Sequence, residues 1–150
     1  GQAWGIYGFL LSYIYTGDAT MIDLSKRLAN YFLNRLPEDY VCHWDLALVG
    51  TDALRDSSSA AIAVCGLLEL VKHLPATDPD RERYLAWAKG IMSSLTKHYL
   101  MGKEEKGTGL LKHSVYHLAS NKGVDECASW GDYFYVEALV RFTQSWKLYW

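Results

Sequence analysis

An all-α fold with alternating inner and outer helices is predicted by three features of the sequence. Residues 3–15 contain only Ser12 as a clearly polar side chain, and residues 60–71 are apolar on nearly every face. A helix that is apolar all round must be covered all round. Residues 19–36 and 79–100 instead carry apolar side chains on one face, as surface helices do. This alternation is typical of an α/α toroid, in which inner helices line an axis and outer helices wrap them; a plain helical bundle or solenoid is the alternative.

The first two predicted helices span residues 3–16 and 19–36. Gly17 ends the first helix, because glycine readily adopts the left-handed conformation found at helix C-termini. Pro37 ends the second, because the residue before a proline disfavours the helical conformation. The second helix has apolar residues at three- and four-residue spacing on one face: Met21, Leu24, Leu28, Phe32 and Leu36.

A central helix is predicted over residues 57–74, ending before Pro75. Asp56 precedes it and is interpreted mainly as its N-cap, because a carboxylate can accept from the free backbone N–H groups of the first turn. Cys65 is predicted to be a small core residue. Several small side chains should let neighbouring helices approach closely, namely Ala60, Ala61, Ala63 and Gly66.

The remainder of the chain is predicted to form a helix over 79–100, a charged glycine-rich turn over 102–109, a short β-like segment over 110–118 and a helix over 131–148. Asp132 is interpreted as the N-terminal cap of the last helix, with a role in ligand binding as the alternative. Glu137, Arg141 and Gln144 form the polar stripe of that helix, and Glu137 and Arg141 are a favourable i,i+4 pair.

The inner helices of such a toroid run parallel, because each outer helix returns the chain. The N-terminal ends at residues 1–4, 55–59 and 129–132 are therefore predicted to meet at one mouth. Helix N-termini carry partial positive charge, so this mouth suits a carboxylated or otherwise anionic ligand. Five helices cannot close a ring, so the open flanks are expected to be apolar and to need a partner.

The composition excludes several classes of protein. The 150 residues are 50% hydrophobic and 21% charged, which indicates one globular segment. A net charge of −2 without a Lys/Arg cluster argues against nucleic-acid binding, and no apolar run reaches membrane-spanning length. Cys42, Cys65 and Cys127 lack metal-ligand spacing and favour a reduced, cytoplasmic setting without a metal. Because the chain starts at Gly1 and enters an apolar run at once, it is expected to begin inside a domain.

Four segments at the predicted mouth carry a family resemblance. They are Gly-Gln-Ala-Trp-Gly at 1–5, the segment 40–45 with its Trp-Asp pair, Arg-Asp-Ser-Ser at 55–58, and 123–134 with its Gly-Val-Asp and Trp-Gly-Asp-Tyr-Phe. Together they resemble the unsaturated glucuronyl hydrolases of glycoside hydrolase family 88, in particular the streptococcal-type unsaturated chondroitin disaccharide hydrolases. The resemblance spans the whole chain in the right order.

The resemblance implies an (α/α)6 barrel, of which residues 1–150 would be a single segment forming the C-terminal part. It implies hydrolysis of the Δ4,5-unsaturated glucuronic acid at the non-reducing end of glycosaminoglycan disaccharides, by hydration of the C4=C5 bond and without a cofactor. The family's catalytic aspartates lie in the N-terminal half. No catalytic residue is therefore expected in this chain, and the missing N-terminal half of the barrel is an expected partner.

Five residues are candidate substrate ligands within this resemblance. Trp4 matches a pocket tryptophan of the family, with a core position as the alternative. Trp44 either lines the mouth or packs beneath a loop. The streptococcal-type enzymes grip a sulfate group with a Ser-x-x-Ser-x-Lys segment; Ser120 and Lys122 match it, and His117 replaces the first serine. The alternative for these three residues is a solvated polar loop.

Two further functions are compatible with the sequence. One is that of the related unsaturated rhamnogalacturonyl hydrolases, which share the barrel and the hydration chemistry. The other is a non-catalytic helical module that binds sugars or another protein. An assay on unsaturated chondroitin disaccharide separates these alternatives from the predicted activity.

Overall fold

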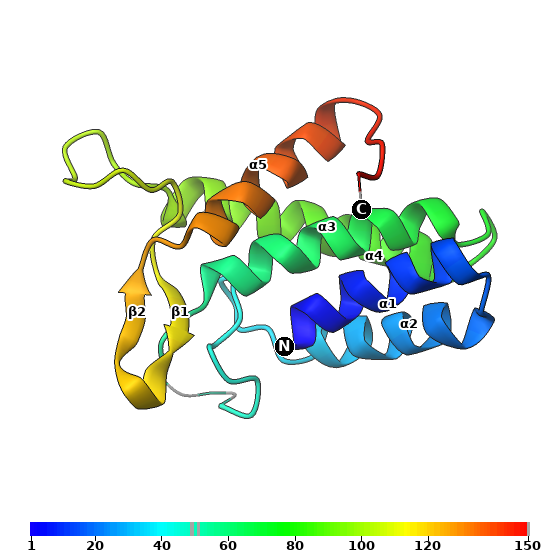
Figure 1. Ribbon diagram of the computed structural model, residues 1–150, viewed down its shortest axis with the longest axis horizontal. Coiled ribbons are helices and arrows are strands. Elements are labelled where there is room, and N and C mark those ends of the chain that lie inside the picture. Colours follow the sequence, from blue (N-terminus) through cyan, green and yellow to red (C-terminus); the bar gives the residue numbers. More distant parts are fainter. Residues whose placement is uncertain (49, 51, 150) are drawn as a thin grey trace.

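The computed structural model describes residues 1–48, 50 and 52–149, and these form five α-helices and one β-hairpin (Figure 1). The elements follow the predicted order. They are α1 (Gln2–Thr16), α2 (Ala19–Leu33), α3 (Ser57–His73), α4 (Pro79–Ser94) continued by the π-helical turn η1 (Leu95–Tyr99), β1 (Ser114–His117), the 3-10 turn η2 (Leu118–Ser120), β2 (Lys122–Glu126) and α5 (Ser129–Thr143).

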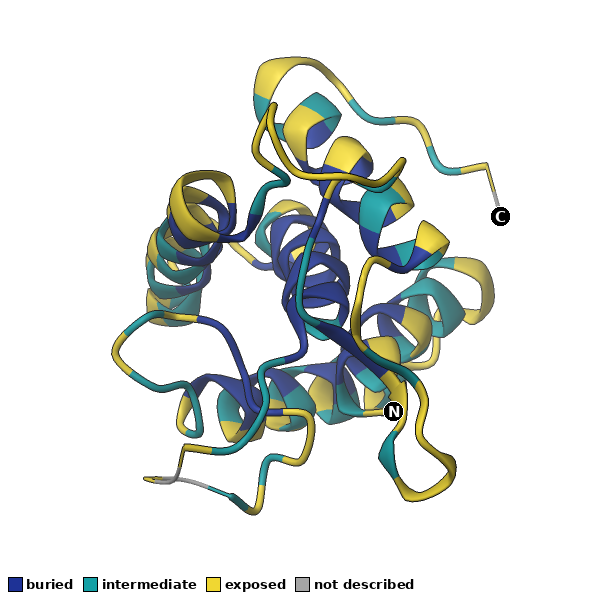
Figure 2. Ribbon diagram, turned by 90° about the vertical axis from the view of Figure 1, so that its left-hand side faces the viewer, coloured by how far each residue is buried: buried dark blue, intermediate teal, exposed yellow. Residues whose placement is uncertain are grey.

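Helix α3 lies at the centre of the fold. It packs against α1, α4 and α5, and its residues from Ser57 to Leu70 are buried except for Ser59. Viewed from the end at which α3 begins, its buried backbone is surrounded by the other helices (Figure 2). A Cβ atom at Gly66 would lie 2.9 Å from Ile6 Cγ2 and 3.2 Å from the backbone nitrogen of Tyr7, so the glycine permits the close approach of α1. The predicted central helix is confirmed.

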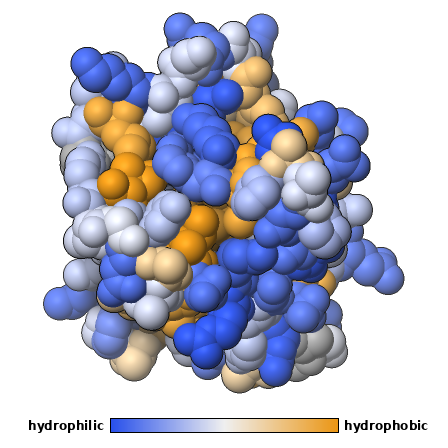
Figure 3. Space-filling view, turned by 90° about the vertical axis from the view of Figure 1, so that its right-hand side faces the viewer, coloured by the Kyte–Doolittle hydropathy of each residue, from blue (hydrophilic) through white to orange (hydrophobic). Residues whose placement is uncertain are grey.

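Helices α1, α3 and α5 begin at the same end of the molecule, while α2 and α4 run in the opposite direction (Figure 1). The predicted alternation of inner and returning outer helices is therefore confirmed. The two-stranded antiparallel hairpin lies at the end where the inner helices begin, with Val115 opposite Val124 and His117 opposite Lys122. The opposite end carries mainly hydrophilic side chains with apolar patches between them (Figure 3).

Two predicted helix ends differ from the structure. Helix α2 stops at Leu33, because the next turn tightens into i,i+3 hydrogen bonds from Arg35 to Phe32 and from Leu36 to Leu33. Helix α5 stops at Thr143 instead of residue 148. Gln144 still donates to the carbonyl of Val140, but its own backbone is extended, with φ −154° and ψ 168°, and the helix ends there.

The predicted cap at Asp132 is wrong. Helix α5 begins after Ala128 without a side-chain cap, and the carboxylate of Asp132 instead accepts from the backbone N–H of Leu111 at 2.8 Å. This hydrogen bond ties the start of α5 to the segment that leads into β1. The predicted N-cap at Asp56 is confirmed, since its side chain accepts from the backbone nitrogen of Ser58.

The polar stripe of α5 lies inside the protein at Glu137 and Arg141. Arg141 donates to Glu137 at 2.8 Å, to the Tyr7 hydroxyl at 2.5 Å and to Glu69, so one guanidinium links α1, α3 and α5. Tyr7 in turn donates to Glu137 at 2.9 Å. Although burial raises the pKa of Glu69, the hydrogen bond and charge of Arg141 outweigh it, and the pKa lies below its ordinary value. Buried carboxylates are tolerated here because a buried cation pairs with them.

Candidate functional site

A cavity of about 390 Å³ opens where the inner helices begin. It is bounded by the first turns of α1 and α3, the start of α5 and strand β1. The prediction that three helix N-termini meet at one mouth is therefore confirmed. The lining residues are Gly1, Trp4, Asp56, Ser58, Ser59, Ile62, Val115, Tyr116 and Trp130.

Aromatic side chains form much of the wall of this cavity. Trp4 is 49% exposed, and the rings of Tyr116 and Trp130 lean on each other at 5.5 Å with 56° between their planes. Aromatic faces pack well against the C–H groups of sugars. Of these three aromatic residues, only Trp4 was predicted from the sequence to contact a ligand. Simple alternation along β1 does not predict that both Val115 and Tyr116 face the cavity; the hairpin register shifts just before Val115.

The carboxylate of Asp56 is committed to the first turn of α3. It accepts from the hydroxyls of Ser58 at 2.7 Å and Ser59 at 2.5 Å, and from the backbone nitrogens of Ser58 and Val115 at 3.2 and 3.4 Å. Among the described residues that line the cavity, Asp56 is the only carboxylate. A group satisfied by four donors is suited to holding the wall in place rather than to exchanging protons.

The loop before α3 is fixed by a second polar network. Arg55 donates to Asp39 at 3.1 Å, and the Tyr99 hydroxyl donates to the same carboxylate at 2.7 Å. Burial raises the pKa of Asp39, but hydrogen bonds from Tyr99 and Arg55 outweigh burial and lower the pKa. Trp44 lies on this loop, 39% exposed, with its backbone nitrogen donating to Leu54 at 3.0 Å. The structure does not bring Trp44 into the wall of the cavity.

His117, Ser120 and Lys122 come together at the tip of the hairpin. His117 pairs with Lys122 across the strands, and its Nδ1 accepts from the backbone N–H of Ser120 at 3.2 Å. The Ser120 hydroxyl lies 2.7 Å from the same nitrogen. All three side chains are exposed. A ring nitrogen that accepts from a backbone N–H is unprotonated, so the Ser120 hydroxyl is the donor of the second contact.

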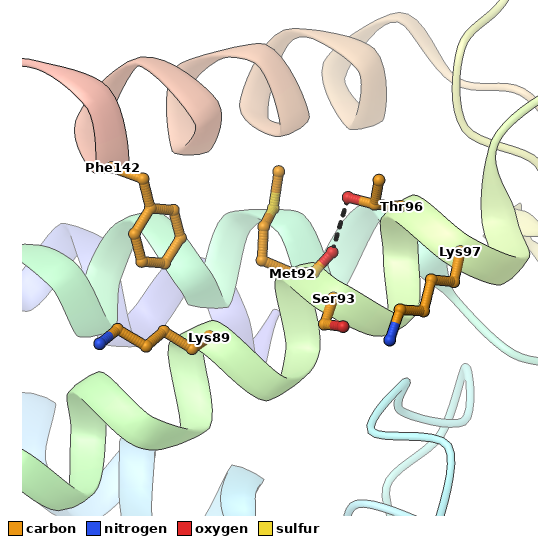
Figure 4. Close-up of a pocket in the computed structure, with 6 residues that line it drawn as sticks. All are labelled: Lys89, Met92, Ser93, Thr96, Lys97 and Phe142. Atoms are coloured by element: carbon orange, nitrogen blue, oxygen red, sulfur yellow. Dashed lines mark hydrogen bonds between the residues drawn. The ribbon is translucent and has the colours of Figure 1, made fainter.

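A second hollow of the described chain is mainly apolar. A hollow of about 310 Å³ lies between α4 and α5, where Met92 and Phe142 face each other and Lys89 and Lys97 extend outward (Figure 4). This hollow lies between an outer and an inner helix, and no acidic side chain lines it. We interpret it as a gap in the packing of α4 against α5. Within residues 1–48, 50 and 52–149, no group of three His, Cys, Asp or Glu side chains could hold a metal ion. No helix of that described part is long and apolar enough to cross a membrane.

Comparison with known proteins decides the relationship. No family model matches the chain. It is 49% identical to the unsaturated chondroitin disaccharide hydrolase of Streptococcus pneumoniae, over 100% of this chain and 38% of that protein. The unsaturated glucuronyl hydrolase of Bacillus sp. strain GL1 is 40% identical over 100% of this chain and 40% of its own length. The chain is homologous to the unsaturated glucuronyl hydrolases.

Solved structures of the unsaturated glucuronyl hydrolases agree with this relationship. A mutant of the Streptococcus agalactiae enzyme, crystallised with dGlcA-GalNAc6S, superimposes with a TM-score of 0.95 at 50% identity, covering 100% of this chain and 40% of that chain. The Bacillus sp. GL1 enzyme gives a TM-score of 0.91. The predicted fold is therefore confirmed: α1 to α5 are part of an (α/α)6 barrel. This chain spans about two-fifths of the length of these glucuronyl hydrolases.

Proposed function

We propose that this chain forms one side of the substrate pocket of an unsaturated glucuronyl hydrolase that acts on glycosaminoglycan disaccharides. The observation that supports the proposal is the mouth cavity, in which helix N-termini and three aromatic rings converge. Partial positive charge at the helix N-termini favours the carboxylate of the unsaturated uronic acid. Trp4, Tyr116 and Trp130 offer flat apolar surface to the sugar rings.

The proposed reaction is the hydration of a vinyl ether. An aspartic acid donates a proton to C4, water adds at C5, and the resulting hemiketal opens and releases the neighbouring sugar. This chemistry differs from the usual pair of carboxylates that flank a glycosidic bond. Asp56 is an unsuitable acid because its oxygens already accept hydrogen bonds from Ser58, Ser59 and Val115. The catalytic aspartates, in this proposal, belong to the N-terminal half of the barrel, outside these 150 residues, and no cofactor is involved.

A chimeric hydrolase tests the proposal. In it, the matching segment of the Streptococcus agalactiae enzyme is replaced by this chain, which is 50% identical to it. We expect the chimeric hydrolase to remove the C4=C5 absorbance of unsaturated chondroitin disaccharide, within about tenfold of the parent rate, or ~1.4 kcal/mol in activation free energy. A folded chimeric hydrolase that neither binds nor turns over the disaccharide would contradict the proposal.

The hairpin tip is proposed to read sulfate on the substrate. The Ser120 hydroxyl and backbone N–H both donate to His117, so Lys122 remains the main group that can attract an anion. Serine at position 117 would free these donors and remove the bulk of the ring. In the chimeric hydrolase, His117→Ser is therefore expected to raise kcat/KM for a sulfated disaccharide, relative to the unsulfated one, about two- to tenfold.

Two further variants control the sulfate experiment. Lys122→Ala should lower the same ratio of kcat/KM values, because it removes the charge that attracts the anion. His98→Ser, at an exposed histidine of η1 away from the hairpin, should leave the ratio unchanged. If His117→Ser also leaves the ratio unchanged, the hairpin does not recognise sulfate through this position.

A further inference from the structure

The indole ring of Trp4 leans on an aromatic side chain of α5. It meets the ring of Phe134 edge to face, with 5.1 Å between the ring centroids and 86° between the planes. Half of Trp4 is exposed where it lines the mouth cavity. Because an edge-to-face pair has a preferred geometry, the Phe134 contact favours one direction of this half-exposed ring.

Phe134 is itself held on several sides. It is 5% exposed, and its ring also packs edge to face with Tyr7 at 6.2 Å and with Tyr133 at 4.9 Å. Trp4 and Tyr7 lie three residues apart on α1, so they share one face of that helix, and Phe134 contacts both. The Tyr7 hydroxyl donates to Glu137, one turn beyond Phe134 on α5. Phe134 is thus anchored in the packing of α1 against α5.

The start of α5 also approaches α3 closely. A Cβ atom at Gly131 would lie 3.1 Å from Ser58 Cβ, a tight contact that the glycine avoids. Gly131 is three residues before Phe134 and therefore on the same face of α5. The close approach places Phe134 directly behind the wall that Trp4 and Ser58 form at the cavity.

From this arrangement we infer that Phe134 is a positioning residue for substrate recognition. Phe134 is not among the residues that line the cavity. It acts through Trp4, whose ring it holds in the direction that faces the sugar. This inference rests on the function proposed above for the mouth cavity.

Substitution of Phe134 in the chimeric hydrolase tests the inference. Phe134→Leu removes the ring edge, and kcat/KM for unsaturated chondroitin disaccharide is expected to fall about two- to tenfold. Phe134→Met, which fills the space with a flexible chain, serves if the leucine variant does not fold. The matched control is Phe32→Leu at a buried phenylalanine of the outer helix α2. It should lower the unfolding midpoint but leave kcat/KM unchanged.

Making Phe134→Leu in a Trp4→Ala variant separates a positioning role of Phe134 from a general structural effect. If Phe134 acts through Trp4, Phe134→Leu should cause no further loss of kcat/KM once Trp4 is alanine. An equal further loss in that background, or unchanged kcat/KM in Phe134→Leu alone, would overturn the inference. An active chimeric hydrolase that is insensitive to Trp4→Ala would overturn it as well. Inactivity of the unsubstituted chimeric hydrolase is a different result, because it refutes the proposed function itself.

Discussion

Replacing Arg141 by methionine is expected to lower the free energy of unfolding of the chimeric hydrolase by about 3–5 kcal/mol. Arg141 is the cation between Glu69 and Glu137, and its side chain is fully buried. Its removal leaves Glu137 with the hydrogen bond from Tyr7 but without the cation that pairs with it. A buried carboxylate without a cation is strongly destabilising, whereas methionine only replaces the volume of the arginine stem.

The pH dependence of this loss identifies its cause. In the unsubstituted protein the pKa of Glu69 is lowered, so its ion pair stabilises the fold above the ordinary glutamate pKa of about 4.3 and is lost as pH falls below it. In the Arg141→Met variant, Glu69 loses the hydrogen bond and charge of Arg141 that lower its pKa and keeps only its contacts with Lys72 and His73. The difference in unfolding midpoint should therefore shrink as pH falls below the ordinary glutamate pKa of about 4.3.

Denaturant unfolding with a matched surface variant checks this prediction. Arg83→Met breaks an ion pair with Asp80 whose two side chains are 39% and 25% exposed, and it should cost no more than about 1 kcal/mol. Equal losses for Arg141→Met and Arg83→Met would show that the buried network contributes no special stability.

Trp4→Ala is expected to lower kcat/KM of the chimeric hydrolase about tenfold, or ~1.4 kcal/mol in transition-state stabilisation. The indole is half exposed, so Trp4→Ala removes more surface from the cavity wall than from the hydrophobic core. Steady-state kinetics by loss of the C4=C5 absorbance measures the effect, with the unfolding midpoint as a check on folding.

Tyr31→Ala is the control for Trp4→Ala. Tyr31 is a 44% exposed aromatic residue on the outer helix α2 and is not among the residues that line the cavity, so its loss should not change kcat/KM. Unchanged kinetics for a folded Trp4→Ala variant would assign Trp4 a packing role. The same assay on Trp44→Ala decides whether that residue meets the substrate, which stays a prediction.

Much of the fold could be predicted from periodicity and end signals. The apolar run after Asp56 predicted the central helix, and Gly17 has φ of 73°, the left-handed conformation expected where α1 ends. The end of α5 was not predictable in this way, because neither glycine nor proline follows Thr143. Nor could a helical pattern show that Glu69, Glu137 and Arg141 meet, since their pairing depends on how α3 packs against α5.

The candidate site was predicted in outline and not in detail. Parallel inner helices place their N-termini together, which was enough to expect the cavity and Trp4 within it. Tyr116 lines the cavity beside Val115, and alternation along a four-residue strand does not predict that both neighbours do so. The hydrogen bond between His117 and Ser120 depends on the turn η2, so the sequence showed the three polar residues but not that two of them satisfy each other.

The most direct test assays turnover by the purified 150-residue chain beside the chimeric hydrolase. It asks whether this segment supplies pocket surface but not the catalytic acid. Among the described residues that line the cavity, Asp56 has the only carboxylate. It accepts hydrogen bonds from Ser58, Ser59 and Val115. We predict that the chimeric hydrolase removes the C4=C5 absorbance of unsaturated chondroitin disaccharide and that the 150-residue chain alone does not. Turnover by the chain alone would show that it contains a catalytic acid and would contradict this account.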